Sequence, residues 1–289
     1  MDRPTLRTPG DLRPGVHPDV RPDVRLDVRD DGPPDGEPVL LLHGFPQDGT
    51  CWSGVAPVLR RAGLRTLVPD QRGLAPGARP RGRRAYRLEL LVQDAVAVLD
   101  AAGPERAHVV GHDWGGIVAW ALAGHRPERV ASLTVASVPH PRALARSLTR
   151  SSQALRSTYV GAFQLPRLPE ALLGPRLEDL LRRSGLPAAE AARYAARMRE
   201  PGALTGALNW YRALPLSRLR SAPVDVPTTY VWGSRDPALG RRAAELTAEQ
   251  VRGPYRFVEL DAGHWLPETR AGELAELVLE RVGGAETAL

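Results

Sequence analysis

A series of short apolar runs that alternate with helix-like stretches constrains the fold of this chain more than any other feature. The runs occupy residues 39–44, 65–70, 107–111, 132–137, 228–233 and 255–260. Such runs are typical of strands that are buried on both faces of a sheet. Helical periodicity fills the intervals at residues 88–102, 117–123, 241–251 and 271–282. Strands that alternate with helices predict an α/β fold with a doubly wound, mostly parallel sheet.

One long interval breaks this alternation. Between Ser137 and Thr228 the sequence shows short helical pieces punctuated by proline and glycine, and no buried strand is indicated. A stretch of this length is too long for a structureless loop. We therefore expect an inserted helical cap at 139–223, between core segments 23–138 and 224–289. Residues 1–22 are expected to form a flexible arm, and the alternating apolar residues at 24–28 predict an edge strand.

Composition and charge exclude several classes of protein. The chain has 289 residues, is 43% hydrophobic and carries a net charge of +6, and its basic residues are all arginine. The arginines are scattered, without a recognition motif, so nucleic-acid binding is not expected. Cys51 is the only cysteine, which allows no intrachain disulfide. Because no apolar run approaches the roughly 20 residues that span a bilayer, we expect a soluble, cytoplasmic protein.

The sequence Val-Val-Gly-His-Asp-Trp-Gly-Gly at 109–116 predicts a tight turn from a strand into a helix. Such a turn lifts its central side chain to the top of the sheet, at the start of the helix. The central residue is Asp113, where many hydrolases carry a serine. A carboxylate is already ionised near neutral pH, since its ordinary pKa is about 3.9. Asp113 is therefore a candidate nucleophile that needs no base to activate it.

Three further residues are predicted to meet Asp113 at the carboxyl ends of the strands. His43-Gly44-Phe45-Pro46 follows a buried strand, so the amides of Phe45 and Trp114 can converge as an oxyanion hole. Asp236 and His264 follow the last two buried strands. The order nucleophile, acid, histidine is the order of the α/β-hydrolase fold. In this interpretation Asp236 orients His264.

These motifs together resemble the epoxide hydrolase branch of the α/β-hydrolase superfamily, from about residue 24 to 283. The resemblance rests on HGFP (43–46), DQRG (70–73), GHDWGG (111–116), WGSRDP (232–237) and GHW (263–265). Relatives of this branch carry one cap tyrosine in a Y-x-x-x-F-Q stretch and another in N-W-Y-R. The matching positions here are Tyr159 and Tyr211. Leu74 departs from the branch, whose members often carry an aromatic residue there.

The resemblance implies conversion of an epoxide to a vicinal diol through an ester on Asp113. The two tyrosines would protonate the departing oxygen, and His264 would activate the water that hydrolyses the ester. The implied partners are an epoxide and water, with no metal, cofactor, nucleic acid or membrane, in a monomer or homodimer. Candidate substrate-binding residues are Trp114, Phe163, Trp210, Trp265 and His140.

Other functions remain open on the same residues. A haloalkane or haloacid dehalogenase uses the same Asp-His-acid set, although Phe45, Trp114 and Ile117 do not match the halide-holding or arginine positions of those enzymes. A non-catalytic small-molecule receptor on this fold is a second alternative, but such receptors often lack a triad member. A serine esterase is not expected because no serine stands at the turn. The sequence does not separate a detoxifying from a biosynthetic role.

Overall fold

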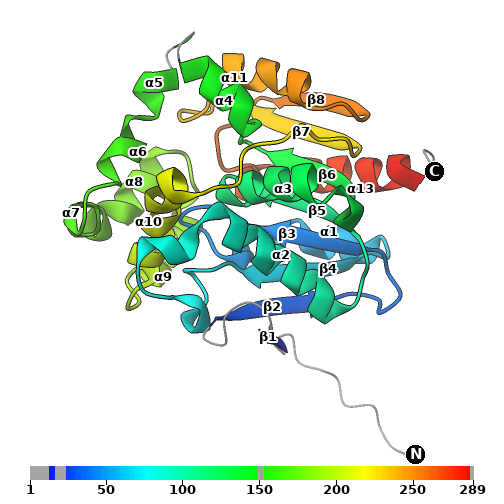
Figure 1. The fold of residues 1–289 in the computed structure, drawn as a ribbon, viewed down its shortest axis with the longest axis horizontal. Coiled ribbons are helices and arrows are strands. Elements are labelled where there is room, and N and C mark those ends of the chain that lie inside the picture. Colours follow the sequence, from blue (N-terminus) through cyan, green and yellow to red (C-terminus); the bar gives the residue numbers. More distant parts are fainter. Residues whose placement is uncertain (1–12, 17–23, 149–150, 152, 287–289) are drawn as a thin grey trace, which may run out of the picture.

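The structure is a computed structural model that describes residues 13–16, 24–148, 151 and 153–286. Its described strands form one sheet in the order β1-β2-β4-β3-β5-β6-β7-β8 (Figure 1). Strands β3 to β8 run parallel, while β1 and β2 pair antiparallel at one side. The predicted mostly parallel sheet is therefore confirmed. The strands are β1 Arg13–Val16, β2 Arg25–Asp31, β3 Pro38–Leu42, β4 Arg65–Asp70, β5 Ala107–His112, β6 Val130–Ala136, β7 Thr228–Gly233 and β8 Tyr255–Leu260.

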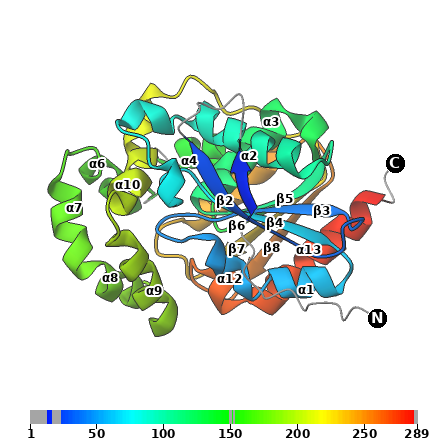
Figure 2. The same cartoon turned by 90° about the horizontal axis from the view of Figure 1, so that it is seen from below.

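Helices cover both faces of the sheet, which explains why its central strands are buried along their whole length. Every residue of β5 and of β7 is buried. Helices α2 and α3 lie on one face, and α1 and α13 lie on the other (Figure 2). The helices outside the insertion are α1 Ala56–Arg61, α2 Leu88–Ala102, α3 Trp114–His125, α11 Arg241–Leu246, α12 Leu266–Thr269 and α13 Ala271–Glu286.

The chain between β6 and β7 is helical and lies largely over the carboxyl ends of the strands. Its helices are α4 Pro141–Leu148, α5 Gln153–Arg156, α6 Thr158–Ala162, α7 Leu168–Leu173, α8 Leu177–Arg183, α9 Ala188–Met198 and α10 Ala203–Ala213. Helix α4 packs against α11 of the core. Helices α6 to α10 form a separate group beside the sheet, which we call the cap helices (Figures 1 and 2).

Short 3-10 helices fill many of the connections. They are η1 Gly49–Ser53, η2 Pro76–Ala78, η3 Arg83–Tyr86, η4 Pro127–Arg129, η5 Gly174–Arg176, η6 Leu214–Leu216 and η7 Thr247–Gln250. The cap is tied to the core at its base, where the indole Nε1 of Trp210 donates to the carbonyl of Arg72 at 2.8 Å. Ion pairs from Arg79 to Glu200 and from Arg197 to Asp70 add to this contact. These contacts fix the base of the cap helices against the core.

Some elements differ from the sequence predictions. The strand predicted at 24–28 is β2, but it is not the edge strand because β1 pairs with it on its outer side. Residues 13–16 thus belong to the sheet rather than to a flexible arm, and the other positions of the predicted arm lie outside the described residues. The helix predicted at 241–251 tightens into η7 after Leu246. None of the described helices is long and apolar enough to cross a membrane.

Candidate active site

A strained turn presents Asp113 at the carboxyl end of β5. The backbone of Asp113 has φ 50° and ψ −120°, an uncommon conformation for a residue with a side chain, and α3 begins at the next residue. The turn fits because glycines stand two positions before and after Asp113, at Gly111 and Gly115. A Cβ on Gly115 would lie 2.1 Å from the carbonyl oxygen of Leu42. This close approach of backbones accounts for the glycines that flank the aspartate in the sequence.

A backbone amide lies beside the Asp113 carboxylate. The N–H of Phe45 donates to Asp113 Oδ1 at 2.8 Å. The approach requires the preceding glycine, since a Cβ on Gly44 would lie 2.4 Å from the Cβ of Asp113. Trp114 is the first residue of α3, so its N–H has no acceptor within the helix. These are the two amides that the sequence analysis assigned to an oxyanion hole.

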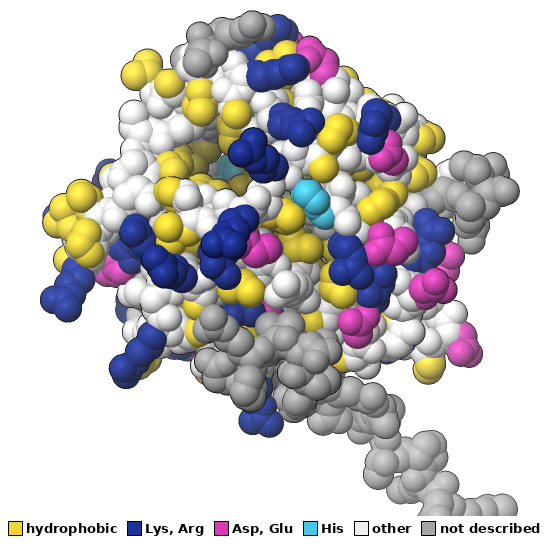
Figure 3. Space-filling model, in the orientation of Figure 1, with side chains coloured by type: hydrophobic (Ala, Val, Ile, Leu, Met, Phe, Trp, Pro, Cys, Tyr) yellow, Lys and Arg dark blue, Asp and Glu magenta, His cyan; other side chains and the backbone are white. Residues whose placement is uncertain are grey.

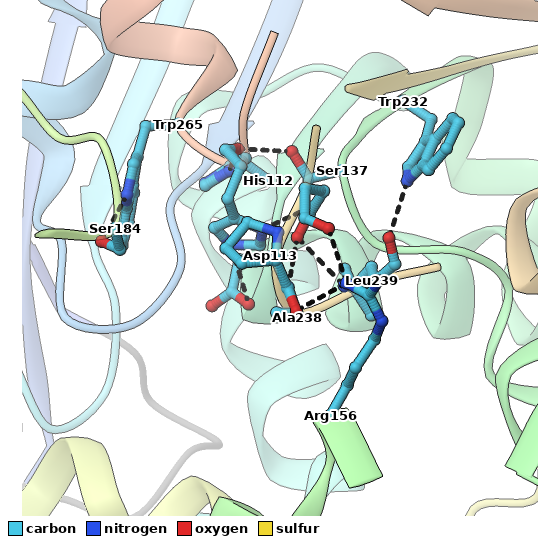
Figure 4. Close-up of polar contacts among 12 residues, drawn as sticks. His112, Asp113, Ser137, Arg156, Ser184, Trp232, Ala238, Leu239 and Trp265 are labelled. Atoms are coloured by element: carbon cyan, nitrogen blue, oxygen red, sulfur yellow. Dashed lines mark hydrogen bonds and ion pairs between the residues drawn. The ribbon is translucent and has the colours of Figure 1, made fainter. Parts of the chain in front are cut away.

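His264 lies between two carboxylates. Its Nδ1 is 2.7 Å from Asp236 Oδ2, and its Nε2 is 3.6 Å from Asp113 Oδ2. The other oxygen of Asp236 accepts hydrogen bonds from the backbone amides of Ala238 and Leu239, at 2.7 and 3.0 Å (Figure 4). These bonds hold the Asp236 carboxylate so that it faces Nδ1 and leaves Nε2 turned toward Asp113.

The charges of this group favour an ion pair in the resting site. Burial by itself lowers the pKa of His264, but the carboxylates of Asp236 and Asp113 outweigh burial and raise it to about 10. Burial likewise favours a neutral Asp113, yet the facing imidazole of His264 and the Phe45 amide lower the pKa of that carboxyl. At neutral pH the site therefore holds an ionised Asp113 beside a protonated His264.

A cavity of about 450 Å³ opens above Asp113 and His264. Its wall is almost wholly apolar and comes from the core and from the inserted helices, including Ile117, Leu144, Phe163, Leu173, Leu177 and Leu181. In the space-filling view, hydrophobic side chains border a hollow at the upper left of the molecule (Figure 3). A cavity of this size and lining is typical of a site for an apolar small molecule.

Both predicted cap tyrosines line this cavity. The ring of Tyr211 packs edge-on against Trp114, with centroids 4.9 Å apart, and against Phe45 at 5.5 Å. Tyr159 lies 6.0 Å from Tyr211 and is 37% exposed, whereas Tyr211 is 5% exposed. Burial and the nearby Asp113 carboxylate raise the pKa of both phenols, so each holds its proton at neutral pH. The phenols are the cavity's neutral proton donors.

The structure brings some of the predicted pocket residues to the cavity and excludes two of them. Trp114, Phe163 and Trp265 line it. Trp210 does not, because its indole is directed into the base of the cap, where it donates to the Arg72 carbonyl. His140 does not either, since its Nε2 bonds to the carbonyl of Ala222 behind the cavity wall. Both side chains are buried outside the cavity lining, so their assignment as substrate-binding residues is corrected.

A buried polar network behind His264 was not foreseen from the sequence. The carbonyl of His264 accepts from Ser137 Oγ at 2.6 Å and lies 2.9 Å from His112 Nε2 (Figure 4). The other nitrogen of His112 lies 2.8 Å from Gln47 Oε1, and Gln47 Nε2 donates to Glu268 Oε1 at 2.7 Å. This network fixes the backbone that carries His264. Its members are spread along the chain without a shared motif. Only the position of Glu268, four residues after His264, places a member of the network near the site in the sequence.

Tyr194 ends this network at the carboxyl group of Glu268. The hydroxyl of Tyr194 donates to Glu268 Oε1 at 2.8 Å. The other carboxyl oxygen, Oε2, is buried without a hydrogen-bond partner among the described residues. Burial raises the pKa of the Glu268 carboxyl from its ordinary 4.5 to about 7. The folded protein thus binds a proton at Glu268 more tightly than the unfolded chain does.

This difference predicts a pH-dependent stability that Glu268→Gln should remove. The contribution of protonated Glu268 is complete below about pH 4.5 and disappears as the pH rises through about 7. Between about pH 4.5 and pH 8, we expect the wild type to lose on the order of 1–2 kcal/mol of unfolding free energy that the glutamine variant retains. Urea denaturation of both proteins across this range measures the difference. Parallel pH profiles would contradict the assignment, and Glu249→Gln at an exposed ion pair serves as the control.

Comparison with known proteins agrees with this geometry. Residues 37–271 match the family model described as alpha/beta hydrolase fold. The AB hydrolase superfamily protein YfhM of Bacillus subtilis is 36% identical, covering 84% of this chain and 88% of the relative. Epoxide hydrolase A of Mycobacterium tuberculosis is 34% identical, covering 86% and 91%. The crystal structure of epoxide hydrolase A from Mycobacterium thermoresistibile superposes with a TM-score of 0.78 at 30% identity, covering 90% of this chain and 95% of that one.

The sheet, the strained turn and the matched family model define the class of this protein. The chain belongs to the α/β-hydrolase fold family. Within that family it falls in the branch that contains the epoxide hydrolases. The fold and the branch expected from the sequence motifs are both confirmed.

Proposed function

We propose that the protein hydrolyses an epoxide to a vicinal diol through a covalent ester on Asp113. The observation that carries this proposal is a carboxylate at the strained turn, facing an apolar cavity that two phenols also line. Relatives and structural neighbours named as epoxide hydrolases support it. A cytoplasmic location belongs to the same proposal and agrees with the buried, free thiol of Cys51.

In the first step, an Asp113 oxygen attacks an epoxide carbon. A new carbon–oxygen bond forms as the strained ring bond breaks, and its electron pair stays on the departing oxygen. That alkoxide takes a proton from Tyr159 or Tyr211, which leaves a phenolate and an ester on Asp113. The raised pKa of each phenol keeps its proton in place until the alkoxide, a strong base, develops beside it.

Ester formation changes the state of His264. The ester is neutral, so it removes one of the two carboxylate charges that raise the pKa of the imidazole. The imidazolium proton can then move through solvent to the phenolate, which restores the phenol and leaves a neutral His264. Asp236 retains its hydrogen bond to Nδ1 at 2.7 Å. The base therefore becomes available only after the substrate is attached.

In the second step, neutral His264 takes a proton from water as the oxygen attacks the ester carbonyl of Asp113. The Phe45 amide faces the oxygen on which negative charge develops, and in this proposal the N–H of Trp114 at the start of α3 is the second donor to it. Collapse breaks the bond between the Asp113 carbonyl carbon and the substrate oxygen, and the departing alkoxide takes the second proton of the attacking water from the new carboxyl group. The neutral diol leaves, and Asp113 is again a carboxylate beside a protonated His264. One epoxide and one water are consumed for each diol. An ether on a serine would resist this water, which accounts for the carboxylate.

Single-turnover hydrolysis of styrene oxide in heavy-oxygen water tests the proposal. We expect the first diol to carry unlabelled oxygen from Asp113 and the label to enter the peptide that contains residue 113. Mass spectrometry of the diol and of the digested protein measures both. Label in the first diol would exclude the ester route. Halide release from a bromoalkane, with no diol from any epoxide, would assign the site to dehalogenation instead.

A further inference from the structure

A basic groove lies beside the cavity. It has a volume of about 670 Å³ and is formed where the end of α8 meets the loops after β7 and β8 and the end of α12. Three arginines line it, namely Arg183, Arg235 and Arg270, and the described residues of its lining include no carboxylate. The mechanism proposed above uses none of these arginines. The groove therefore needs a separate explanation.

Its positive charge is only partly neutralised. Arg235 pairs with Asp261 at 3.1 Å, and Arg270 pairs with Glu273 at 3.3 Å. Arg183 stands at the end of α8 and has no acidic partner among the described residues. Both pairs are substantially exposed, so water and salt weaken them. Arg183 is thus the arginine of the groove that is best able to bind an anion, and guanidinium groups bind carboxylates well.

The groove and the cavity share a wall. Ser184, Pro237 and Trp265 line both of them. The indole Nε1 of Trp265 donates to Ser184 Oγ at 2.9 Å (Figure 4). Pro237 directly follows the catalytic acid Asp236. A ligand whose reactive end reaches Asp113 therefore needs only to extend over the edge formed by Ser184 and Pro237 for its other end to reach the arginines.

We propose that the preferred substrate is an epoxide on an apolar chain or ring system that ends in an anionic group, with that anion held in the basic groove by Arg183. This inference rests on the proposed function. The apolar cavity binds the body of such a molecule, and the groove binds its charged end. A neutral epoxide of the same size fills the cavity equally well but leaves Arg183 without a counterion, so the groove determines specificity.

Kinetic comparison of matched substrates tests this inference. The probes are epoxyundecanoate, its methyl ester, and the phosphate monoester of the corresponding epoxy alcohol. In the wild type we expect kcat/KM for the carboxylate to exceed that for the methyl ester. In Arg183→Glu the ratio of the two should fall about five- to ten-fold, because a repulsion replaces an attraction between exposed charges. If kcat/KM for the phosphate monoester exceeds that for the methyl ester as much as the carboxylate does, the groove recognises anions in general. If kcat/KM for the phosphate monoester does not exceed that for the methyl ester, the groove recognises carboxylates.

The neighbouring arginine provides the control. Arg182 is exposed on the same turn of α8 but does not line the groove, so Arg182→Glu should leave the ratio at its wild-type value. The preference should also shrink as salt is raised. The inference would be overturned if the ratio of kcat/KM for the carboxylate to that for the methyl ester were one or less in the wild type, or equal in the two variants. The proposal of epoxide hydrolysis would stand in either case.

A binding measurement separates the inference from the proposed function. If no epoxide is hydrolysed, the proposed function fails, and calorimetry with unreactive undecanoate then examines the groove directly. Binding to the wild type and to Arg182→Glu that weakens in Arg183→Glu supports the anion site. Equal binding to all three proteins, or no binding, rejects it.

Discussion

Replacing His264 with glutamine is expected to arrest the protein after its first chemical step, with substrate esterified to Asp113. In the proposed mechanism, ring opening requires the Asp113 carboxylate and a phenol. The imidazole of His264 takes no part in that step. Hydrolysis of the ester requires a base, which glutamine does not provide. We expect at most one diol-forming event for each active site and steady-state turnover lower by a factor of about 10⁴ or more, the scale seen when a catalytic triad member is removed.

Mass spectrometry of the intact variant and of its peptides measures this result. The mass should rise by that of one epoxide, on the peptide that contains residue 113. Asp113→Ala should show neither the adduct nor turnover. His108→Gln is the matched control, because His108 is a buried histidine that contacts Ser132 at the far end of β5 from the cavity. Rapid multiple turnover by His264→Gln would refute the role given to the imidazole.

The glutamine variant also tests the electrostatic account of the resting site. Since the folded pKa of His264 is raised from 6.5 to about 10, its contribution to stability is complete below about pH 6.5 and disappears as the pH rises through about 10. That decline in stability should be absent in the glutamine variant. In the proposed mechanism, the ion pair that stabilises the resting protein also keeps His264 protonated until Asp113 is esterified.

The parts of the fold that sequence predicted well are those in which burial dictates residue type. Strands β4 and β7 and helix α2 have the predicted bounds, because both sheet faces are covered at these strands and one helix face packs on the sheet. Strand β8 also has the predicted bounds, but the prediction that it is buried on both faces is wrong, because it is the edge strand and none of its residues is buried. The proximity of Asp113, Asp236 and His264 was predicted for a related reason. Backbone crowding at the turn restricts Gly115 to glycine, and parallel strand ends place Asp236 and His264 on the same side.

The remaining features depend on contacts that no local pattern encodes. Strand β1 contains proline and glycine, which are unfavourable in strands, and forms only by pairing with β2. Trp210 stands next to Tyr211 in the sequence, but on a helix the two side chains point in different directions, and only that of Tyr211 lines the cavity. The network from His112 through Gln47 to Glu268 joins three separate segments. Such long-range polar contacts become visible only in the folded chain.

Removing both cap phenols is expected to slow ring opening far more than removing either one. Each phenol can protonate the departing oxygen, and a single acid catalyst contributes about 10²- to 10⁴-fold to a rate. Tyr159→Phe and Tyr211→Phe should each lower the rate of ester formation by about 10²-fold or less, because the other phenol remains. We expect the larger single effect for Tyr211, which is 5% exposed and packed against Trp114, whereas Tyr159 is 37% exposed.

The double variant should lower that rate by about 10³-fold or more, because ring opening would then produce an unprotonated alkoxide in an apolar cavity. Rapid-quench measurement of the ester in a His264→Gln background isolates this step from hydrolysis. Tyr255→Phe is the control, since its hydroxyl is buried without a hydrogen-bond partner among the described residues and lies outside the cavity. Ester formation at the parent rate in the double variant would mean that the alkoxide is stabilised by another group. The role of the cap would then be limited to shaping the apolar wall.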